Sequence, residues 1–105
     1  MKGKFCQILI SATNKSEANK ISDNLVRKKL IAGSLIIKGP SRYWWRGKIV
    51  EKTYFNIQAF SVRENKQLIV REVKKIHSDK CPIVAFLQID GNQDFLNWIR
   101  VSLKR

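Results

Sequence analysis

Apolar residues recur along the chain with two different spacings. Runs rich in branched and aromatic residues predict strands, whereas apolar residues three or four positions apart predict amphipathic helices. The predicted strands span residues 5–12, 34–38, 49–61 and 83–89. The predicted helices place apolar positions at Ala18, Ile21, Leu25 and Leu30, at Ile69, Val73 and Ile76, and at Phe95, Ile99 and Leu103. The predicted order is strand, helix, strand, strand, helix, strand, helix.

Polar residues mark where these helices begin. Asn14, with Glu17 three residues later, predicts a capped start for the first helix. Ser61 and Glu64 have the same spacing and predict a capping box for the second. The last helix is expected to start at residues 91–92.

This order is typical of a split βαβ fold. We therefore predict an α+β, ferredoxin-like sandwich with an extra C-terminal helix, in one domain over residues 1–105. Two helices would cover one face of a four-stranded antiparallel sheet. The other face would be bare and apolar, and self-association is the simplest way to cover it.

The segment from Ser41 to Ile49 holds two adjacent tryptophans, Trp44 and Trp45. Adjacent side chains of a strand point to opposite faces. We therefore expect one tryptophan in the interior of the domain and the other toward water or another subunit, although a half-exposed edge without a partner is an alternative. Gly47 predicts a bend or bulge in the strand.

The composition excludes several classes of protein. With 44% hydrophobic residues the chain can build a core, and it has no apolar run long enough to span a bilayer. The N-terminal residues do not fit a secretion signal. The two cysteines, Cys6 and Cys81, make no disulfide framework. We therefore expect a cytoplasmic protein, with Cys6 as a small buried hydrophobe.

The formal net charge is +13, and residues 1–52 hold 12 of the 21 basic residues but 3 of the 8 acidic ones. Such a charge favours contact with nucleic acid or another polyanion at low salt, whereas the alternative is a solvated basic surface. Cations and aromatics interleave in one segment, with Arg42, Arg46 and Lys48 among Tyr43, Trp44 and Trp45. This mixture can stack on bases and bind phosphates. Alternatively, the aromatics form an oligomer interface with a basic rim.

His77, Asp79 and Cys81 are the candidate metal ligands, because imidazole, carboxylate and thiolate can together bind a divalent metal ion. The alternative for His77 is structural: it caps the helix or hydrogen-bonds a neighbour. Cys81 as a nucleophile would need His77 as its base and a third, orienting group. No complete catalytic constellation is present, so we predict a binding protein and not an enzyme.

The chain resembles the CutA family of divalent-cation tolerance proteins over nearly its whole length. The residues that carry the resemblance are Glu17, Ala18, Leu30, Ala32, Ser41, Tyr43, Trp44, Trp45, Gly47, Lys48, Ile49, His77, Pro82, Asn92, Asp94, Leu96 and Trp98. The segment from Ser41 follows the family's Ser-x-Tyr-x-Trp-x-Gly-x-Ile pattern. The resemblance implies a tight homotrimer with sheet faces toward the threefold axis, and it favours Tyr43, Trp44 and Trp45 as residues of the oligomer interface with the neighbouring cations as its rim. It implies no established reaction, and a role in metal tolerance with weak copper binding.

The chain also departs from the family pattern. Where members commonly carry His-Pro-Tyr-Glu/Asp-x-Pro-Glu, this chain has the segment from His77 to Ile83. Asp79 replaces the tyrosine, while Lys80 and Ile83 replace the acidic residues. Thr13 stands in the loop where members carry a cysteine. The resemblance therefore implies a diverged member whose metal site is partly dismantled.

Overall fold

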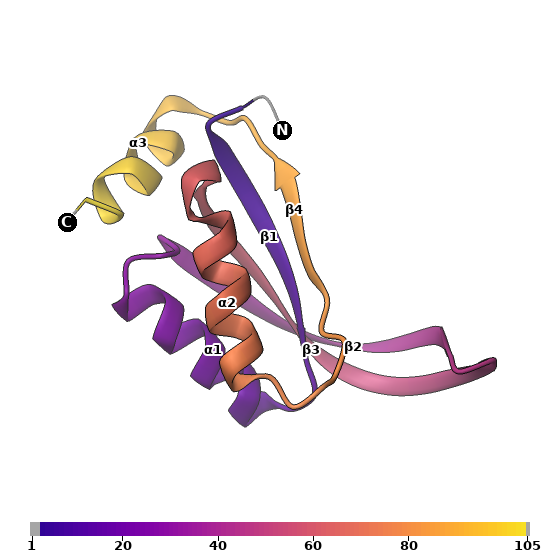
Figure 1. Cartoon of the computed structure of the whole chain (residues 1–105). Helices are drawn as coiled ribbons and strands as arrows, with labels where there is room; N and C mark the ends of the chain where they lie inside the picture. Colours follow the sequence, from indigo (N-terminus) through magenta and orange to yellow (C-terminus); the bar gives the residue numbers. More distant parts are fainter. Residues whose placement is uncertain (1–2, 105) are drawn as a thin grey trace.

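The computed structural model describes residues 3–104 and confirms the predicted order of elements (Figure 1). The elements are β1 (Phe5–Ala12), α1 (Lys15–Arg27), β2 (Gly33–Trp45), β3 (Lys48–Val62), the short 3₁₀ turn η1 (Arg63–Asn65), α2 (Lys66–Ile76), β4 (Val84–Gln88) and α3 (Gln93–Ser102). Met1 and Lys2, part of the N-terminal segment discussed above, lie outside the described residues.

The four strands form one sheet in the order β2-β3-β1-β4, and every neighbouring pair is antiparallel. β3 lies between β1 and β2, and β1 lies between β3 and β4. Each strand–helix–strand unit is thus split by a strand of the other unit, which confirms the predicted ferredoxin-like arrangement.

The main core lies between the sheet and helices α1 and α2. Alternate residues of β1 point into it, and the apolar positions of both helices pack against them. The fully buried side chains include Ile8, Ile10, Ile21, Leu25, Ile57, Ile69 and Val73. The helical spacing read from the sequence therefore identifies the correct faces.

Helix α3 packs on the other side of the sheet, near one end. Leu96 and Ile99 are buried against Phe5, with Phe60 partly buried beside them. The rest of this face is open, with Leu35 55% and Leu87 54% exposed. The predicted bare apolar face is therefore present but is partly covered by α3.

The outer halves of β2 and β3 form a two-stranded arm. β1 pairs only with residues 55–62 of β3, so residues 39–54 continue as a hairpin beyond the sheet (Figure 1). The predicted bend at Gly47 is wrong. Arg46 and Gly47 instead form the hairpin turn, with positive φ angles of 51° and 76°. A two-residue turn with two positive φ angles matches the right-handed twist of its strands.

The arm also corrects the expected placement of the tryptophans. Trp44 is 72% exposed and Trp45 is 43% exposed, so neither fills the interior of the domain. Alternation does put them on opposite faces, but no further strand or helix covers either face of the arm at this point within the part of the chain that the structure describes. A partner for at least one face stays a prediction.

One predicted helix cap is confirmed and one is wrong. The Asn14 side chain accepts a hydrogen bond of 2.8 Å from the Glu17 amide, as expected for an N-cap. Ser61 does not cap α2. Its hydroxyl is buried and donates to the Leu30 carbonyl, and the chain enters α2 through η1.

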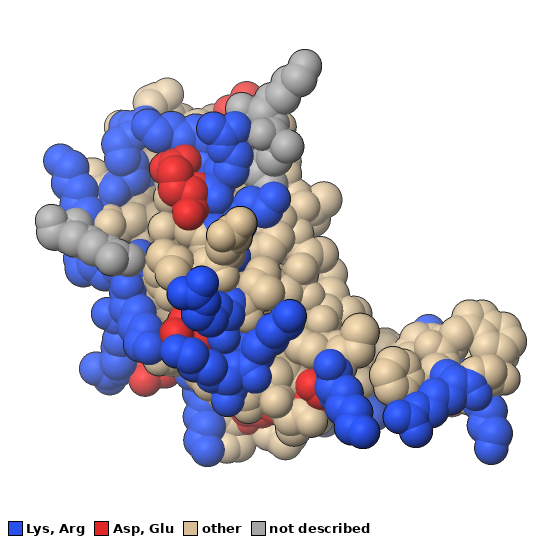
Figure 2. Space-filling model, in the orientation of Figure 1, with Lys and Arg blue, Asp and Glu red and all other residues tan. Residues whose placement is uncertain are grey.

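Charged side chains cover much of the helical side of the molecule. Figure 2 shows lysines and arginines gathered over this side and along the arm. Some are paired: Glu72 accepts from both Lys28 and Lys75, and Arg27 pairs with Asp23. Within residues 3–104, no helix is long and apolar enough to cross a membrane.

Candidate ligand pocket at the base of the arm

A cavity of about 450 Å³ lies between the arm and the loop that follows α2. We call it the arm pocket. Its lining residues are Tyr43, Trp45, Arg46, Lys52, Tyr54, Ser78, Asp79, Lys80 and Cys81. Two groups that lie far apart in the sequence, the aromatic segment and the loop after α2, therefore meet in one site.

The strand register explains how the arm supplies its half of the pocket. Tyr43 and Trp45 are two residues apart on β2 and share one face. On β3, Lys52 and Tyr54 pair with residues 41 and 39 of β2. Residues 39 and 41 share one face of β2 with Tyr43 and Trp45, because all four are separated by steps of two. Lys52 and Tyr54 therefore lie on that same face. Trp44 lies on the opposite face. Only one of the two tryptophans can thus contribute to the pocket.

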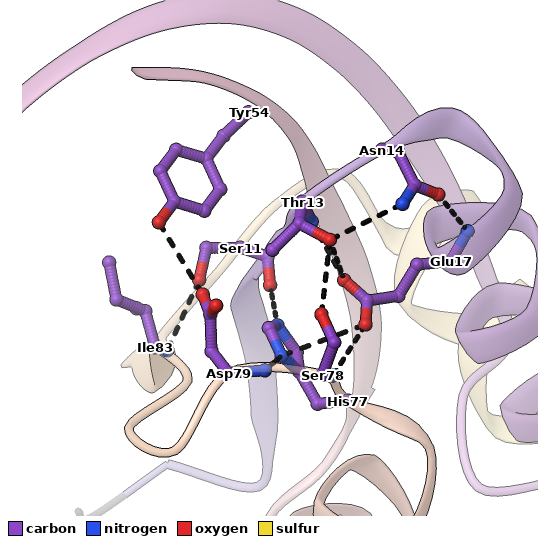
Figure 3. Close-up of polar contacts among 9 residues, drawn as sticks. All are labelled: Ser11, Thr13, Asn14, Glu17, Tyr54, His77, Ser78, Asp79 and Ile83. Atoms are coloured by element: carbon purple, nitrogen blue, oxygen red, sulfur yellow. Dashed lines mark hydrogen bonds and ion pairs between the residues drawn. The ribbon is translucent and has the colours of Figure 1, made fainter. Parts of the chain in front are cut away.

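The loop is held in place by a buried carboxylate beneath it (Figure 3). One oxygen of Glu17 accepts hydrogen bonds from the Thr13 amide (2.8 Å) and the Thr13 hydroxyl (2.7 Å). The other accepts from the Ser78 amide at 2.6 Å. Glu17 therefore connects the end of β1, the start of α1 and the pocket loop.

Burial alone would raise the pKa of Glu17. The hydrogen bonds from Thr13 and Ser78 outweigh burial and lower that pKa from 4.5 to about 2. The carboxylate is therefore charged at neutral pH, although its side chain is only 8% exposed. Hydrogen bonds, not a cation, supply most of the stabilisation of this charge.

His77 is buried below the pocket and both of its ring nitrogens are used. Nδ1 accepts a hydrogen bond of 3.0 Å from the Asp79 amide, and Nε2 contacts the Ser11 carbonyl oxygen (Figure 3). Since an amide only donates and a carbonyl only accepts, the ring is the neutral Nε2–H tautomer. The side chain has no solvent exposure. This matches the structural alternative for His77, and the imidazole has no free lone pair for a metal.

Asp79 lies in the pocket and faces two tyrosines. The Tyr54 hydroxyl donates to Asp79 Oδ2 over 3.4 Å and lies 3.0 Å from the Tyr43 hydroxyl. Burial, the hydrogen bond with Tyr43 and the charge of Asp79 all raise the pKa of Tyr54. The phenol therefore stays protonated and serves as a hydrogen-bond donor. Tyr43, which we predicted at an oligomer interface, takes part in this contact.

The two cysteines lie in opposite environments. Cys6 is fully buried, and burial raises its pKa to about 11, so it stays a neutral thiol as expected. Cys81 is exposed on the rim of the arm pocket. The pairing of Cys81 with His77 as a catalytic base is not available, because the His77 nitrogens already contact Ser11 and Asp79.

The predicted three-ligand metal set is therefore only partly assembled. Asp79 and Cys81 line one pocket, whereas His77 lies beneath it with its nitrogens occupied. Among residues 3–104, no three His, Cys, Asp or Glu side chains are grouped so as to hold a metal ion. Asp79 and Cys81 offer two donors, and the remaining ligands of a bound ion would come from water or from another molecule.

Sequence reasoning missed several residues of this site. Lys52 and Tyr54 are predicted only as part of a strand, and Glu17 is predicted only as part of a helix start and of the family resemblance, with no role at the site. The signal for Lys52 and Tyr54 is that they lie two residues apart in a strand and, once the hairpin turn is known, fall on the same face as Tyr43 and Trp45. No local pattern connects Glu17 with Ser78, because 61 positions separate them.

Comparisons with known proteins agree with this fold. The family model described as "CutA1 divalent ion tolerance protein" matches residues 6–102. The divalent-cation tolerance protein CutA of Archaeoglobus fulgidus is 36% identical over 93 residues, covering 88% of this chain and 91% of that protein. The protein of the same name from Thermotoga maritima is 28% identical over 99 residues, covering 91% and 98%.

Solved structures of divalent cation tolerance proteins also have a fold similar to that of this chain. The periplasmic divalent cation tolerance protein CutA from Archaeoglobus fulgidus superposes with a TM-score of 0.92 at 33% identity, covering 95% of this chain and 99% of that one. The divalent cation tolerance protein from Thermus thermophilus gives a TM-score of 0.90 at 26% identity, covering 93% and 97%. The similarity thus spans the arm and the pocket loop.

Proposed function

Because the chain belongs to the CutA1 family of divalent ion tolerance proteins, we propose that it contributes to divalent-cation tolerance by binding a metal ion and not by catalysis. Its membership confirms the resemblance drawn from the sequence motifs. The observation that carries the proposal is the exposed thiol of Cys81 beside Asp79 in the arm pocket. A thiolate and a carboxylate together suit copper, which accepts soft and hard donors.

We propose copper as the preferred ion, bound weakly by Cys81 and Asp79. Arg46, Lys52 and Lys80 line the same pocket and repel a cation. Two protein donors also leave most coordination positions to water. Both features favour low affinity, in line with the partly dismantled site expected from the sequence.

We also propose that the protein is a homotrimer. The open sheet face still carries Leu35, Ile37 and Leu87 at about half exposure, and the arm carries Trp44 and Ile49 side by side on one face. Exposed apolar surface of this extent is typical of an interface. Sedimentation equilibrium is expected to give about three times the chain mass of 12.2 kDa, and a monomer at micromolar concentration would exclude this assembly.

The compartment we propose is the cytoplasm. Two unpaired cysteines, one of them exposed, suit a reducing environment. The relative from Archaeoglobus fulgidus is described as periplasmic, so fractionation of cells that express this chain is the direct test.

Titration with Cu²⁺ in a calorimeter tests the metal site. Replacing Cys81 with Ser should abolish measurable heat, whereas Lys80→Gln should increase affinity by removing one positive charge from the pocket. Lys20→Gln, on the exposed side of α1, is the matched control and should leave binding unchanged. Undiminished binding by Cys81→Ser would contradict the site.

A further inference from the structure

The arm pocket has an excess of positive charge that the metal proposal does not use. Arg46, Lys52 and Lys80 line it, and Asp79 is its one carboxylate. Within the described part of the chain, none of these three cations pairs with a carboxylate. By contrast, Arg42 on the other face of the arm pairs with Glu51 at 2.5 Å.

Aromatic rings hold two of these cations at the pocket. The Arg46 guanidinium lies 5.6 Å from the centre of the Trp45 ring, and Lys52 Nζ lies 5.3 Å from the centre of the Tyr54 ring. Such contacts position a cation without neutralising it. The positive charge therefore remains available to a bound anion.

An accessible ring completes the lining. Trp45 lines the pocket and is 43% exposed. A volume of about 450 Å³ lies within the usual range for small-molecule sites, roughly 300–1,000 Å³. The pocket is thus large enough for a ring together with an anionic group.

We propose that the arm pocket binds a small phosphate monoester that carries a flat ring. Arg46, Lys52 and Lys80 bind the phosphate, and the exposed part of Trp45 contacts the ring. The charges match, because three cations and one carboxylate leave two positive charges, and a phosphate monoester carries about −1.5 to −2 at pH 7. The proposal does not depend on copper binding, because it uses neither Cys81 nor a metal.

The test is calorimetric titration of the metal-free protein with phenyl phosphate at about 150 mM salt, where long-range charge attraction is screened. The pocket variant combines Arg46→Asn, Lys52→Gln and Lys80→Gln. Asn is chosen at position 46 because it tolerates the positive φ of this turn residue. A control variant, Lys15→Gln with Lys20→Gln and Lys74→Gln, loses the same charge from exposed helix positions.

We expect the pocket variant to bind at least about ten-fold more weakly and the control to change less than about two-fold, since only close cations bind phosphate directly. Trp45→Leu should weaken phenyl phosphate while leaving inorganic phosphate unchanged. Urea melts of each variant check that the fold is intact. Equal loss in both triple variants, or inorganic phosphate binding as tightly as phenyl phosphate, would overturn the proposal.

Discussion

The Asp79 amide donates a hydrogen bond of 3.0 Å to Nδ1 of His77, and this contact determines what the histidine does. It leaves Nε2 as the donor toward the Ser11 carbonyl. Ser11 and His77 are 66 positions apart in the sequence. The imidazole therefore ties the pocket loop to the central strand β1. The one histidine of the chain stabilises the site and does not line it.

We predict that His77→Ala lowers the free energy of unfolding without changing copper affinity. It removes the His77 partner of the Ser11 carbonyl and of the Asp79 amide. Ser11 is buried whereas Asp79 is only half-buried, so most of the loss should come from the Ser11 carbonyl, at about 1–3 kcal/mol for a buried group left unpaired. His77→Gln retains a donor toward Ser11, and His77→Asn retains an acceptor for Asp79, so each should lose less than Ala. Urea denaturation and copper titration measure the two effects. A stable His77→Ala protein that no longer binds copper would restore His77 as a ligand.

Glu17 should make stability depend on pH. Its pKa in the folded protein is about 2 and its ordinary value is 4.5. Since the folded value is the lower one, the stabilisation is complete above pH 4.5 and is lost as pH falls toward 2. Glu17→Gln should remove this part of the acid dependence and lower stability at neutral pH. Melting temperatures from neutral pH down to about pH 2 test this expectation.

Glu72 provides the comparison for that experiment. Hydrogen bonds from Lys28, Asn24 and Lys75 also lower its pKa to about 2. Its partners include two lysines, whereas those of Glu17 are amides and a hydroxyl. Salt should therefore weaken the contribution of Glu72 and leave that of Glu17 nearly unchanged. Equal salt sensitivity of Glu17→Gln and Glu72→Gln would show that Glu17 also depends on nearby cations.

The two tryptophans should differ in their effect on assembly. Trp44 is 72% exposed and lies beside Ile49, whereas Trp45 faces the arm pocket. Trp44→Ala should weaken the trimer by more than about 1 kcal/mol, as loss of an aromatic interface anchor does. Trp45→Ala removes a ring that lines the arm pocket and should weaken assembly less than Trp44→Ala does. Sedimentation over a range of concentrations measures both variants, and the reverse order would assign the interface to Trp45.

Much of the fold follows from local patterns. The strand from Phe5 to Ala12 is predictable because a buried strand is a run of apolar residues. The start of α1 at Asn14 is predictable because an N-cap residue has a fixed position relative to its helix. The turn at Arg46 and Gly47 was missed, since Arg-Gly lacks the Asn or Asp usual at the first position of such a turn. Ser61 was misassigned as a cap because its partner, the Leu30 carbonyl, is 31 positions away.

The site was less predictable than the fold. Its residue types were recognised, but Tyr43 and Cys81 come from separate parts of the chain, and only the position of the arm beside the loop after α2 brings them into one pocket. The expectation that one tryptophan is buried failed for a related reason. Strand alternation gives the face of a side chain, whereas burial depends on how far the neighbouring strands extend, which local spacing does not encode.

The last prediction concerns nucleic acid. The chain carries a formal charge of +13, and a trimer would carry three times that charge. Such a particle attracts any polyanion in dilute buffer, so binding there is not evidence of function. We expect a mixed single-stranded oligonucleotide to bind at low salt without sequence preference and to dissociate near physiological salt, because released counterions drive such binding. Dissociation constants from fluorescence anisotropy at several salt concentrations measure this. Submicromolar affinity persisting near about 150 mM salt, and lost when Arg42, Arg46 and Lys48 are replaced in an intact trimer, would instead favour a polyanion-binding scaffold.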